Sequence, residues 1–215
     1  ALPIYRLSNG RLLLIAVLGL PDPGEVAAQG VERSARGAMI DEMVPLLRRL
    51  WAGETVTHSG EHYELVDASI DPLPVQEPLE LWFGGAVPSA LSRVGRLGDG
   101  YIPGLSTPQE GAEKKLAVQH AAQEFSRVVD PEHFGVNLSY SRGPLSSAAR
   151  EALVQRRPDV DPENLIPTSA ASLNETIDAW IEAGYSKFLL RPVEAPADWS
   201  GELEQLASEV LARQS

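Results

Sequence analysis

The chain has 215 residues, of which 43% are apolar and 22% charged, a composition typical of a folded globular protein rather than a disordered one. Its net charge of −12 disfavours binding to nucleic acids and anionic membranes, because phosphate groups are bound by clustered Lys and Arg. The chain contains no cysteine, which excludes disulfides, thiolate metal sites and thiol nucleophiles. The longest apolar run, Leu12–Leu20, is too short to cross a membrane, and we expect a cytoplasmic protein.

The N-terminal half predicts a buried strand, a long helix and a hairpin. Leu12–Leu18 is a continuous apolar run, which is typical of a strand buried on both faces of a parallel sheet. Arg36–Trp51 repeats apolar residues at helical spacing, and Pro45 is expected to kink or divide this helix. Val56–Leu65 carries strand-forming residues around a Ser-Gly pair and predicts a surface hairpin.

The segment Leu79–Pro103 predicts a βαβ unit. Its first apolar run ends at Gly84-Gly85, a helix with Pro88 in its first turn follows, and a second strand begins after Gly98-Asp99-Gly100. In a parallel sheet, the Gly pair then lies at the carboxyl end of a strand and just before a helix N-terminus. Free backbone N–H groups and the helix dipole favour an anion there. The alternative is a tight turn that needs only the backbone freedom of glycine.

The C-terminal half continues the alternation of strands and helices. Thr107-Pro108-Gln109-Glu110 and Ser172-Leu173-Asn174-Glu175 have the pattern of helix capping boxes, and Gly184 is expected to end the second of these helices. The last helix is expected at Glu202–Ala212. Five strands are predicted in the whole chain, whereas a closed α/β barrel needs eight. These strands are Leu12–Leu18, Glu80–Phe83, Tyr101–Pro103, Phe134–Tyr140 and Lys187–Arg191.

Several short motifs, in a fixed order, resemble the luciferase-like monooxygenase superfamily, and most closely its branch that uses coenzyme F420. They are Leu7-Ser8-Asn9-Gly10-Arg11, Arg36-Gly37 with Asp41-Glu42, Trp82-Phe83-Gly84-Gly85, Gly95–Gly100 and Ser186–Pro192. The resemblance implies a single (β/α)8 TIM-barrel domain over residues 1–215, with the cofactor across the carboxyl ends of the strands. It also implies that Leu12–Leu18 is the fourth strand, so that the first strands are lacking and the native protein is longer.

The resemblance also implies site residues. It places the cofactor phosphate on the backbone amides of Gly84, Gly85, Ala86 and Val87. Tyr140 and Arg191, which end the last two strands, are further candidates for binding the cofactor, with a structural role and a rim ion pair as their alternatives. Glu25 is the candidate catalytic carboxylate, although its surroundings depart from the family's glycine-rich turn. A helix-capping charge cluster is expected for Arg33, Arg36, Asp41 and Glu42.

Metal-dependent and hydrolytic sites are disfavoured by the pattern of residues. His58 and His62 are four residues apart, but Gly60 between them argues against a helix that would bring them onto one face. The chain also has no G-x-S-x-G motif around a nucleophilic serine. We therefore expect neither a metal ion nor a serine hydrolase.

Three functions are compatible with the sequence. The first is an oxidoreductase or monooxygenase, expected to be a homodimer, that uses F420 (alternatively FMN) to transfer hydride to or from a small organic substrate, or to oxygenate it. The second is a Schiff-base lyase, which is disfavoured because Lys187 begins its strand and Lys114 and Lys115 lie on a polar helix. The third is a non-catalytic relative with an incomplete barrel that binds a flavin or serves a structural role.

Overall fold

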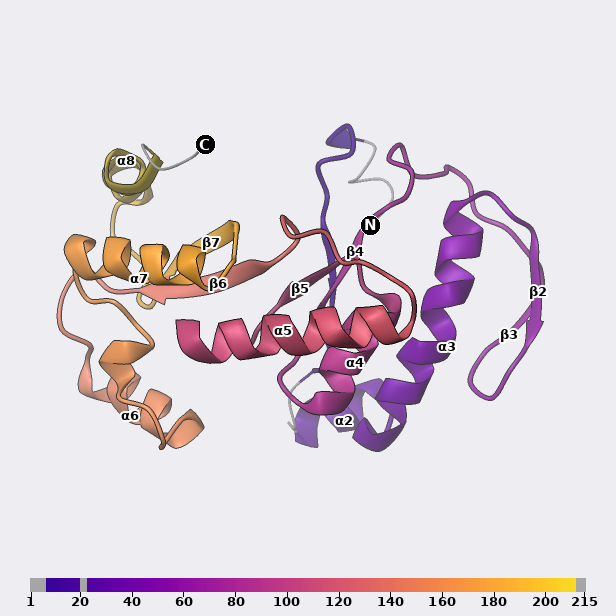
Figure 1. The fold of residues 1–215 in the computed structure, drawn as a ribbon, viewed down its shortest axis with the longest axis horizontal. Coiled ribbons are helices and arrows are strands. Elements are labelled where there is room, and N and C mark those ends of the chain that lie inside the picture. The colour runs from indigo at the N-terminus through magenta and orange to yellow at the C-terminus, as the bar shows by residue number, and fades with distance from the viewer. Residues whose placement is uncertain (1–6, 20–22, 212–215) are drawn as a thin grey trace. The chain divides into compact units, whose positions relative to one another are not determined.

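The computed structural model describes residues 7–19 and 23–211 of the chain (Figure 1). The chain divides into two compact units, which are described separately below. The first unit contains the residues up to Tyr101 together with Ala117–Val129, and the second contains Ile102–Leu116 and the residues from Asp130 onward. The single domain over residues 1–215 stays a prediction. Among the described residues, no helix is both long and apolar enough to cross a membrane.

The first unit contains a three-stranded sheet with the strand order β1-β4-β5. β1 (Leu14–Ala16) pairs in parallel with β4 (Leu81–Gly84), with Ala16 opposite Phe83, and β5 (Gly100–Ile102) follows on the other side of β4. The first three residues of β4 are buried, as expected for a central strand covered on both faces. These strands confirm three of the five that the sequence predicts.

The prediction that Leu12–Leu18 is buried on both faces is wrong. Leu13, Ile15 and Val17 are 39%, 45% and 62% exposed, and they alternate with residues that are partly buried. β1 is an edge strand of the described sheet, and it pairs there only with β4. An apolar run indicates that a strand can be buried on both faces, but other parts of the fold must supply the side chains that cover it. The described residues cover only one face of β1.

The helices of the first unit match the sequence prediction only in part. α2 (Pro23–Gln29) is a helix that the sequence analysis did not predict. α3 (Arg33–Trp51) begins one turn before the predicted start and runs through Pro45, so this proline does not divide the helix. α4 (Pro88–Leu97) has Pro88 in its first turn, as predicted.

The predicted hairpin is confirmed and is tied to α3. β2 (Val56–Ser59) and β3 (Glu64–Ala68) pair in antiparallel fashion beside α3 (Figure 1). Glu42 on α3 accepts hydrogen bonds from the N–H groups of His62 and Tyr63, each at 3.0 Å, and its carboxylate also lies 3.0 Å from His58 Nε2. Together these hydrogen bonds lower the pKa of Glu42 despite the opposing effect of desolvation, which is the largest single influence.

The Gly98-Asp99-Gly100 motif stabilises the amino ends of β4 and β5. Asp99 Oδ2 accepts hydrogen bonds from Arg48 Nη2 at 2.8 Å and from the N–H of Leu81 at 2.9 Å. A Cβ atom at Gly100 would lie 2.3 Å from the ring of Trp82, so the indole packs directly on this backbone. The motif therefore has a structural role, at the end of the sheet opposite to the predicted cofactor face.

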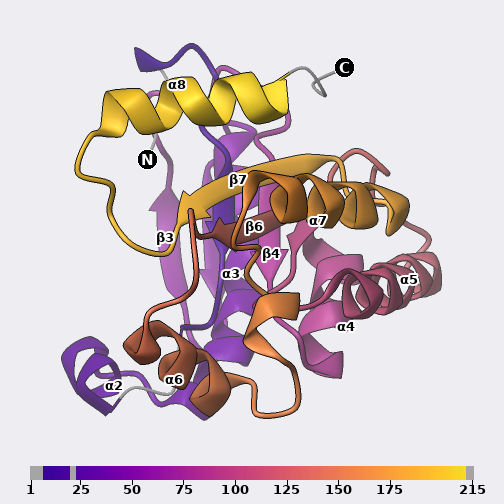
Figure 2. The same cartoon turned by 90° about the vertical axis from the view of Figure 1, so that its left-hand side faces the viewer.

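The second unit contains two parallel strands and the helices near them (Figure 2). β6 (Gly135–Tyr140) pairs with β7 (Lys187–Pro192) over six residues, from Gly135 opposite Lys187 to Tyr140 opposite Pro192. Both strands confirm the prediction. The helices are α6 (Ser147–Arg156), a short 3₁₀ helix (Pro162–Asn164), α7 (Ala170–Glu182) and α8 (Trp199–Val210).

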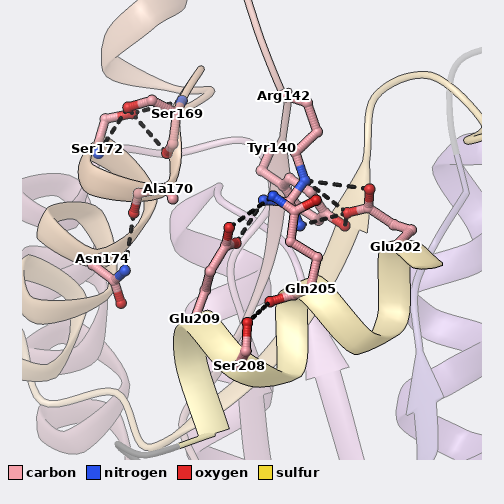
Figure 3. A network of polar contacts seen from close by, with 10 residues as sticks. All are labelled: Tyr140, Arg142, Ser169, Ala170, Ser172, Asn174, Glu202, Gln205, Ser208 and Glu209. Carbon is pink, nitrogen blue, oxygen red and sulfur yellow. Dashed lines mark hydrogen bonds and ion pairs between the residues drawn. The ribbon is translucent and has the colours of Figure 1, made fainter.

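Helix starts in the second half of the chain follow local capping. α5 (Pro108–Glu124), whose first part belongs to the second unit, has the predicted capping box: the Thr107 N–H donates to Glu110 Oε2 at 3.0 Å, and the Glu110 N–H donates to Thr107 Oγ1 at 3.3 Å. The predicted start of α7 is wrong by one turn. Ser169 is its N-cap and Ser172 the reciprocal partner, with both N–H···Oγ bonds at 3.1 Å (Figure 3).

Candidate cofactor site

The glycine pair at the carboxyl end of β4 forms a turn that only glycine adopts readily. Gly85 has a φ of +141°, and a Cβ atom there would lie 2.6 Å from the Cβ of Ala90 in the first turn of α4. The hydroxyl of Tyr101 donates a hydrogen bond to the carbonyl oxygen of Gly85 at 2.6 Å. Burial raises the pKa of Tyr101, which keeps this donor protonated. The path of the backbone through the turn is therefore closely fixed.

The N-terminus of α4 has no side-chain cap. Its N-cap residue, Val87, is extended, with φ −82° and ψ 152°, and makes no side-chain hydrogen bond to the helix. Ala86 and Val87 are exposed, and their N–H groups form no hydrogen bond within the described part of the chain. Uncapped N–H groups at the positive end of a helix dipole bind anions such as phosphate. The turn thus has the donors that the predicted phosphate site requires.

Two ion pairs hold α4 against α3. Asp41 on α3 accepts from Arg93 Nε at 2.6 Å and from Arg96 Nη2 at 2.8 Å. Arg93 is 9% exposed, so its pair with Asp41 is largely shielded from solvent. Asp41 is thus paired with arginines of another helix, and Glu42 holds the hairpin. The prediction of a helix-capping charge cluster is therefore wrong for Asp41 and Glu42, and also for Arg36, whose Nη1 donates to the carbonyl oxygen of Leu18. For Arg33 it stays a prediction.

A cavity of about 280 Å³ lies at the carboxyl end of β1. Arg36, from the first turn of α3, lines it and is 7% exposed. Its Nη1 donates to the carbonyl oxygen of Leu18 at 3.0 Å. Sequence analysis assigned Arg36 to a charge cluster and missed the cavity, because no local pattern shows that the two meet. The cavity is lined by Val17, Leu18, Gly19, Val31, Arg36, Met39, Ile40 and Tyr63.

The candidate catalytic residue Glu25 lies in α2. Its side chain is outside what the structure describes. The catalytic role of Glu25 therefore stays a prediction.

In the second unit, Tyr140 and Arg191 lie at the carboxyl ends of adjacent strands. Arg191 is opposite Ser139, and Tyr140 is opposite Pro192. Arg191 is exposed and forms no hydrogen bond or ion pair within the described residues, so the rim ion pair considered for it is not seen there. Its cation is available to an anionic ligand. Cofactor binding by either residue stays a prediction.

The hydroxyl of Tyr140 is engaged by α8 (Figure 3). Tyr140 is 2% exposed and donates to Glu202 Oε1 at 2.6 Å. Arg142 donates to the same carboxylate, with Nη2 at 2.7 Å from Oε1, and through Nη1 to Glu209 Oε2 at 2.5 Å. Burial and the Glu202 carboxylate raise the pKa of Tyr140 to about 12. The hydrogen bonds from Arg142 and Tyr140 lower the pKa of Glu202.

A larger cavity, of about 1030 Å³, lies among α7, β7 and α8 in the second unit. It adjoins Ser186 and Lys187 at the amino end of β7, and neither Tyr140 nor Arg191 lines it. Barrel enzymes place their sites at the carboxyl ends of the strands, so this cavity is not at the predicted cofactor face. Its apolar lining includes Ile177, Ile181, Phe188, Leu190, Leu203 and Leu206.

Comparison with known protein families identifies the family of this chain. The family model described as "Luciferase-like monooxygenase" matches residues 3–207, which is nearly the whole chain. The chain belongs to the luciferase-like monooxygenase family. Among the described residues, no group of three His, Asp or Glu side chains is arranged to hold a metal ion.

Curated relatives of this luciferase-like protein include two F420-dependent glucose-6-phosphate dehydrogenases. The one from Beutenbergia cavernae is 28% identical over 235 residues, covering 95% of this chain and 66% of the relative. The one from Amycolatopsis mediterranei is 33% identical over 143 residues, covering 63% of this chain and 42% of the relative. The chain thus spans about two thirds or less of the length of these relatives.

A solved structure with the same fold is that of an F420-dependent secondary alcohol dehydrogenase in complex with an F420-acetone adduct. It aligns with all of this chain and 73% of its own, at a TM-score of 0.79 and 20% identity. The predicted luciferase-like (β/α)8 fold is confirmed. Its described parallel strands are β1, β4 and β5 in the first unit and β6 and β7 in the second. The predicted phosphate turn and the Arg36 cavity both lie at the carboxyl ends of these strands, where the active sites of barrel enzymes form.

Proposed function

We propose that the protein is an oxidoreductase that uses coenzyme F420 to transfer hydride to or from a small organic substrate. The uncapped turn Gly85–Val87 is the observation that carries the proposal. It presents N–H groups that have no partner among the described residues, at a helix N-terminus and at the carboxyl end of a buried parallel strand. Membership of the luciferase-like family and the F420-dependent relatives support the choice of cofactor.

The residues of the turn fit a phosphate group. Gly85 brings its backbone close to Ala90, and the neighbouring N–H groups of Ala86 and Val87 have no protein acceptor among the described residues. These neutral donors would hold the phosphate of the cofactor without a lysine. When bound in its reduced form, F420 supplies the hydride. Arg191 is a candidate for a second contact with an anionic part of the ligand, because it is exposed and forms no ion pair with the described residues.

FMN is the alternative cofactor, and oxygenation of the substrate the alternative reaction. Both cofactors present a phosphate, so the turn at Gly85–Val87 does not choose between them. A non-catalytic relative that binds a flavin would use the same turn. The names of the two curated relatives favour F420.

A fluorescence titration of the purified protein tests the proposal. F420 and FMN are titrated separately, and reduction or oxidation of bound F420 is then followed by absorbance with candidate alcohols and sugar phosphates. We expect saturable binding of F420 and weaker or no binding of FMN. Preferential binding of FMN would overturn the choice of cofactor, and binding of neither would overturn the oxidoreductase proposal.

We also propose that the protein is a cytoplasmic homodimer. The resemblance to its family and the acidic, cysteine-free composition support this proposal. Light scattering coupled to size-exclusion chromatography is expected to give twice the mass of one chain. A single-chain mass at micromolar concentration would contradict the dimer.

A further inference from the structure

Arg36 is a buried cation, and three of its five N–H donors, those on Nε and Nη2, have no partner among the described residues. Its side chain is 7% exposed, and Nη1 donates to the Leu18 carbonyl oxygen. Nε and Nη2 are buried and have no acceptor among the described residues. A buried guanidinium without a compensating anion is unfavourable, because it has lost its hydration and gained no opposite charge. Within the described part of the chain, these two nitrogens therefore mark a place where an acceptor is missing.

The carboxylates nearest to Arg36 on its own helix have other partners. Asp41 forms ion pairs with Arg93 and Arg96 on α4. Glu42 accepts from the hairpin residues His62 and Tyr63. Arg36 thus faces its cavity without a carboxylate from α3.

The cavity beside Arg36 has an apolar lining. Val17 and Leu18 line it from the carboxyl end of β1, and Met39 and Ile40 line it from the second turn of α3. Its volume of about 280 Å³ is close to the lower limit of pockets that hold small organic ligands, which is roughly 300 Å³. An apolar pocket with a single cationic edge suits a ligand that has an anionic group beside an apolar one.

We propose that Arg36 binds an oxyanion, a carboxylate or a phosphate, of an organic ligand whose apolar part fills this cavity. Nε and Nη2 form one edge of the planar guanidinium, so their N–H groups are parallel and match two oxygens of such an anion. β1 and β4 are adjacent parallel strands, so the cavity and the turn at Gly85–Val87 lie at the same edge of the sheet. The inference rests on the proposed function where it assigns the anion to the substrate. The oxyanion bound by Arg36 could instead be a second anionic group of the cofactor, and the last experiment below distinguishes the two.

Benzoate and inorganic phosphate serve as probes of the site, in the absence of cofactor. Melting temperatures and calorimetric affinities are measured at constant ionic strength for the wild type, Arg36→Met and Arg33→Met. Arg33 is the matched control, because it is exposed and lies three residues earlier on α3. At ten times the Kd, a probe is expected to raise the melting temperature of the wild type and of Arg33→Met by about 3–6 °C. Arg36→Met is expected to lose this rise and, without a probe, to melt no lower than the wild type.

Two results would overturn the proposal. One is an equal probe-induced rise in the wild type and in Arg36→Met, and the other is no rise in the wild type with either probe. If Arg36→Met does not fold, Arg36→Lys decides, because lysine keeps the charge but lacks the planar edge. It is expected to bind the probes at least about tenfold more weakly, and unchanged affinity would contradict the proposal.

Titration of the same variants with F420 identifies the source of the anion. If F420 affinity is unchanged in Arg36→Met while probe binding is lost, the oxyanion belongs to the substrate, as proposed. If F420 affinity falls by the same factor, the oxyanion belongs to the cofactor and the substrate assignment is wrong. If the wild type binds the probes but not F420, the Arg36 site stands and the proposed function fails.

Discussion

Replacing Val87 with proline removes one N–H donor from the proposed phosphate site without breaking a hydrogen bond to the described residues. The φ of Val87, −82°, lies close to the range that proline adopts. Its N–H forms no hydrogen bond within the described residues, and its side chain is 59% exposed. We therefore expect Val87→Pro to fold with a melting temperature close to that of the wild type.

The expected loss is that of one hydrogen bond to a charged acceptor. Such a bond contributes about 1.5–3 kcal/mol, which corresponds to a roughly 10- to 150-fold increase in the Kd for F420. Fluorescence titration of F420 into the wild type and the variant measures the change. The comparison requires folded protein, which the melting curves confirm.

Val87→Ala is the matched control, because it removes the same side chain and keeps the N–H. It is expected to bind F420 with wild-type affinity. Equal Kd values for Val87→Pro and Val87→Ala would show that the N–H of Val87 does not contact the phosphate.

Three further predictions concern stability. Gly85→Val places a valine at a φ of +141° with its Cβ 2.6 Å from that of Ala90. Urea unfolding is expected to show a loss of about 2–6 kcal/mol in the free energy of unfolding. Gly143→Val is the control, because a Cβ there meets nothing within 4 Å, and it should change this free energy little. Asp99→Ala leaves Arg48 without its carboxylate and is expected to cost about 2–4 kcal/mol by the same measurement; a loss below about 0.5 kcal/mol would contradict the structural role of the motif. The folded-state pKa of Glu202 is lowered, so its contribution to stability is present above its unfolded pKa and lost as the pH falls through the folded one. In Arg142→Met, the free energy of unfolding should therefore decline less steeply below about pH 4.5 than in the wild type. The same pH dependence in both proteins would show that the ion pair of Arg142 with Glu202 contributes nothing to stability.

The parts of the fold that sequence analysis predicted correctly are encoded locally. The capping box of Thr107 and Glu110 and the position of Pro88 each depend on residues within one helical turn. The start of α7 was misplaced because Ser169 and Ser172 both fit a cap, and sequence alone does not rank them. The order of strands followed from the alternation of apolar runs and helices.

The errors and omissions involve contacts between distant parts of the chain. The apolar run at Leu12–Leu18 indicated burial but not which elements supply it, so the exposure of Ile15 was not foreseen. Tyr140 is a candidate for cofactor binding because it lies at a strand end. Its hydrogen bond to Glu202, which is 62 residues later, has no signal in the local sequence. The same holds for Arg36, whose cavity is formed with the end of β1. The phosphate turn was predicted because glycines, a proline and a helix start coincide there.

A crystal structure of the protein with F420 is the most direct test of the proposed phosphate site. The phosphate of F420 is expected to lie within hydrogen-bonding distance, about 2.7–3.2 Å, of backbone nitrogens in Gly85–Val87. A phosphate bound elsewhere, or a deazaflavin seated away from the carboxyl ends of β1 and β4, would contradict it.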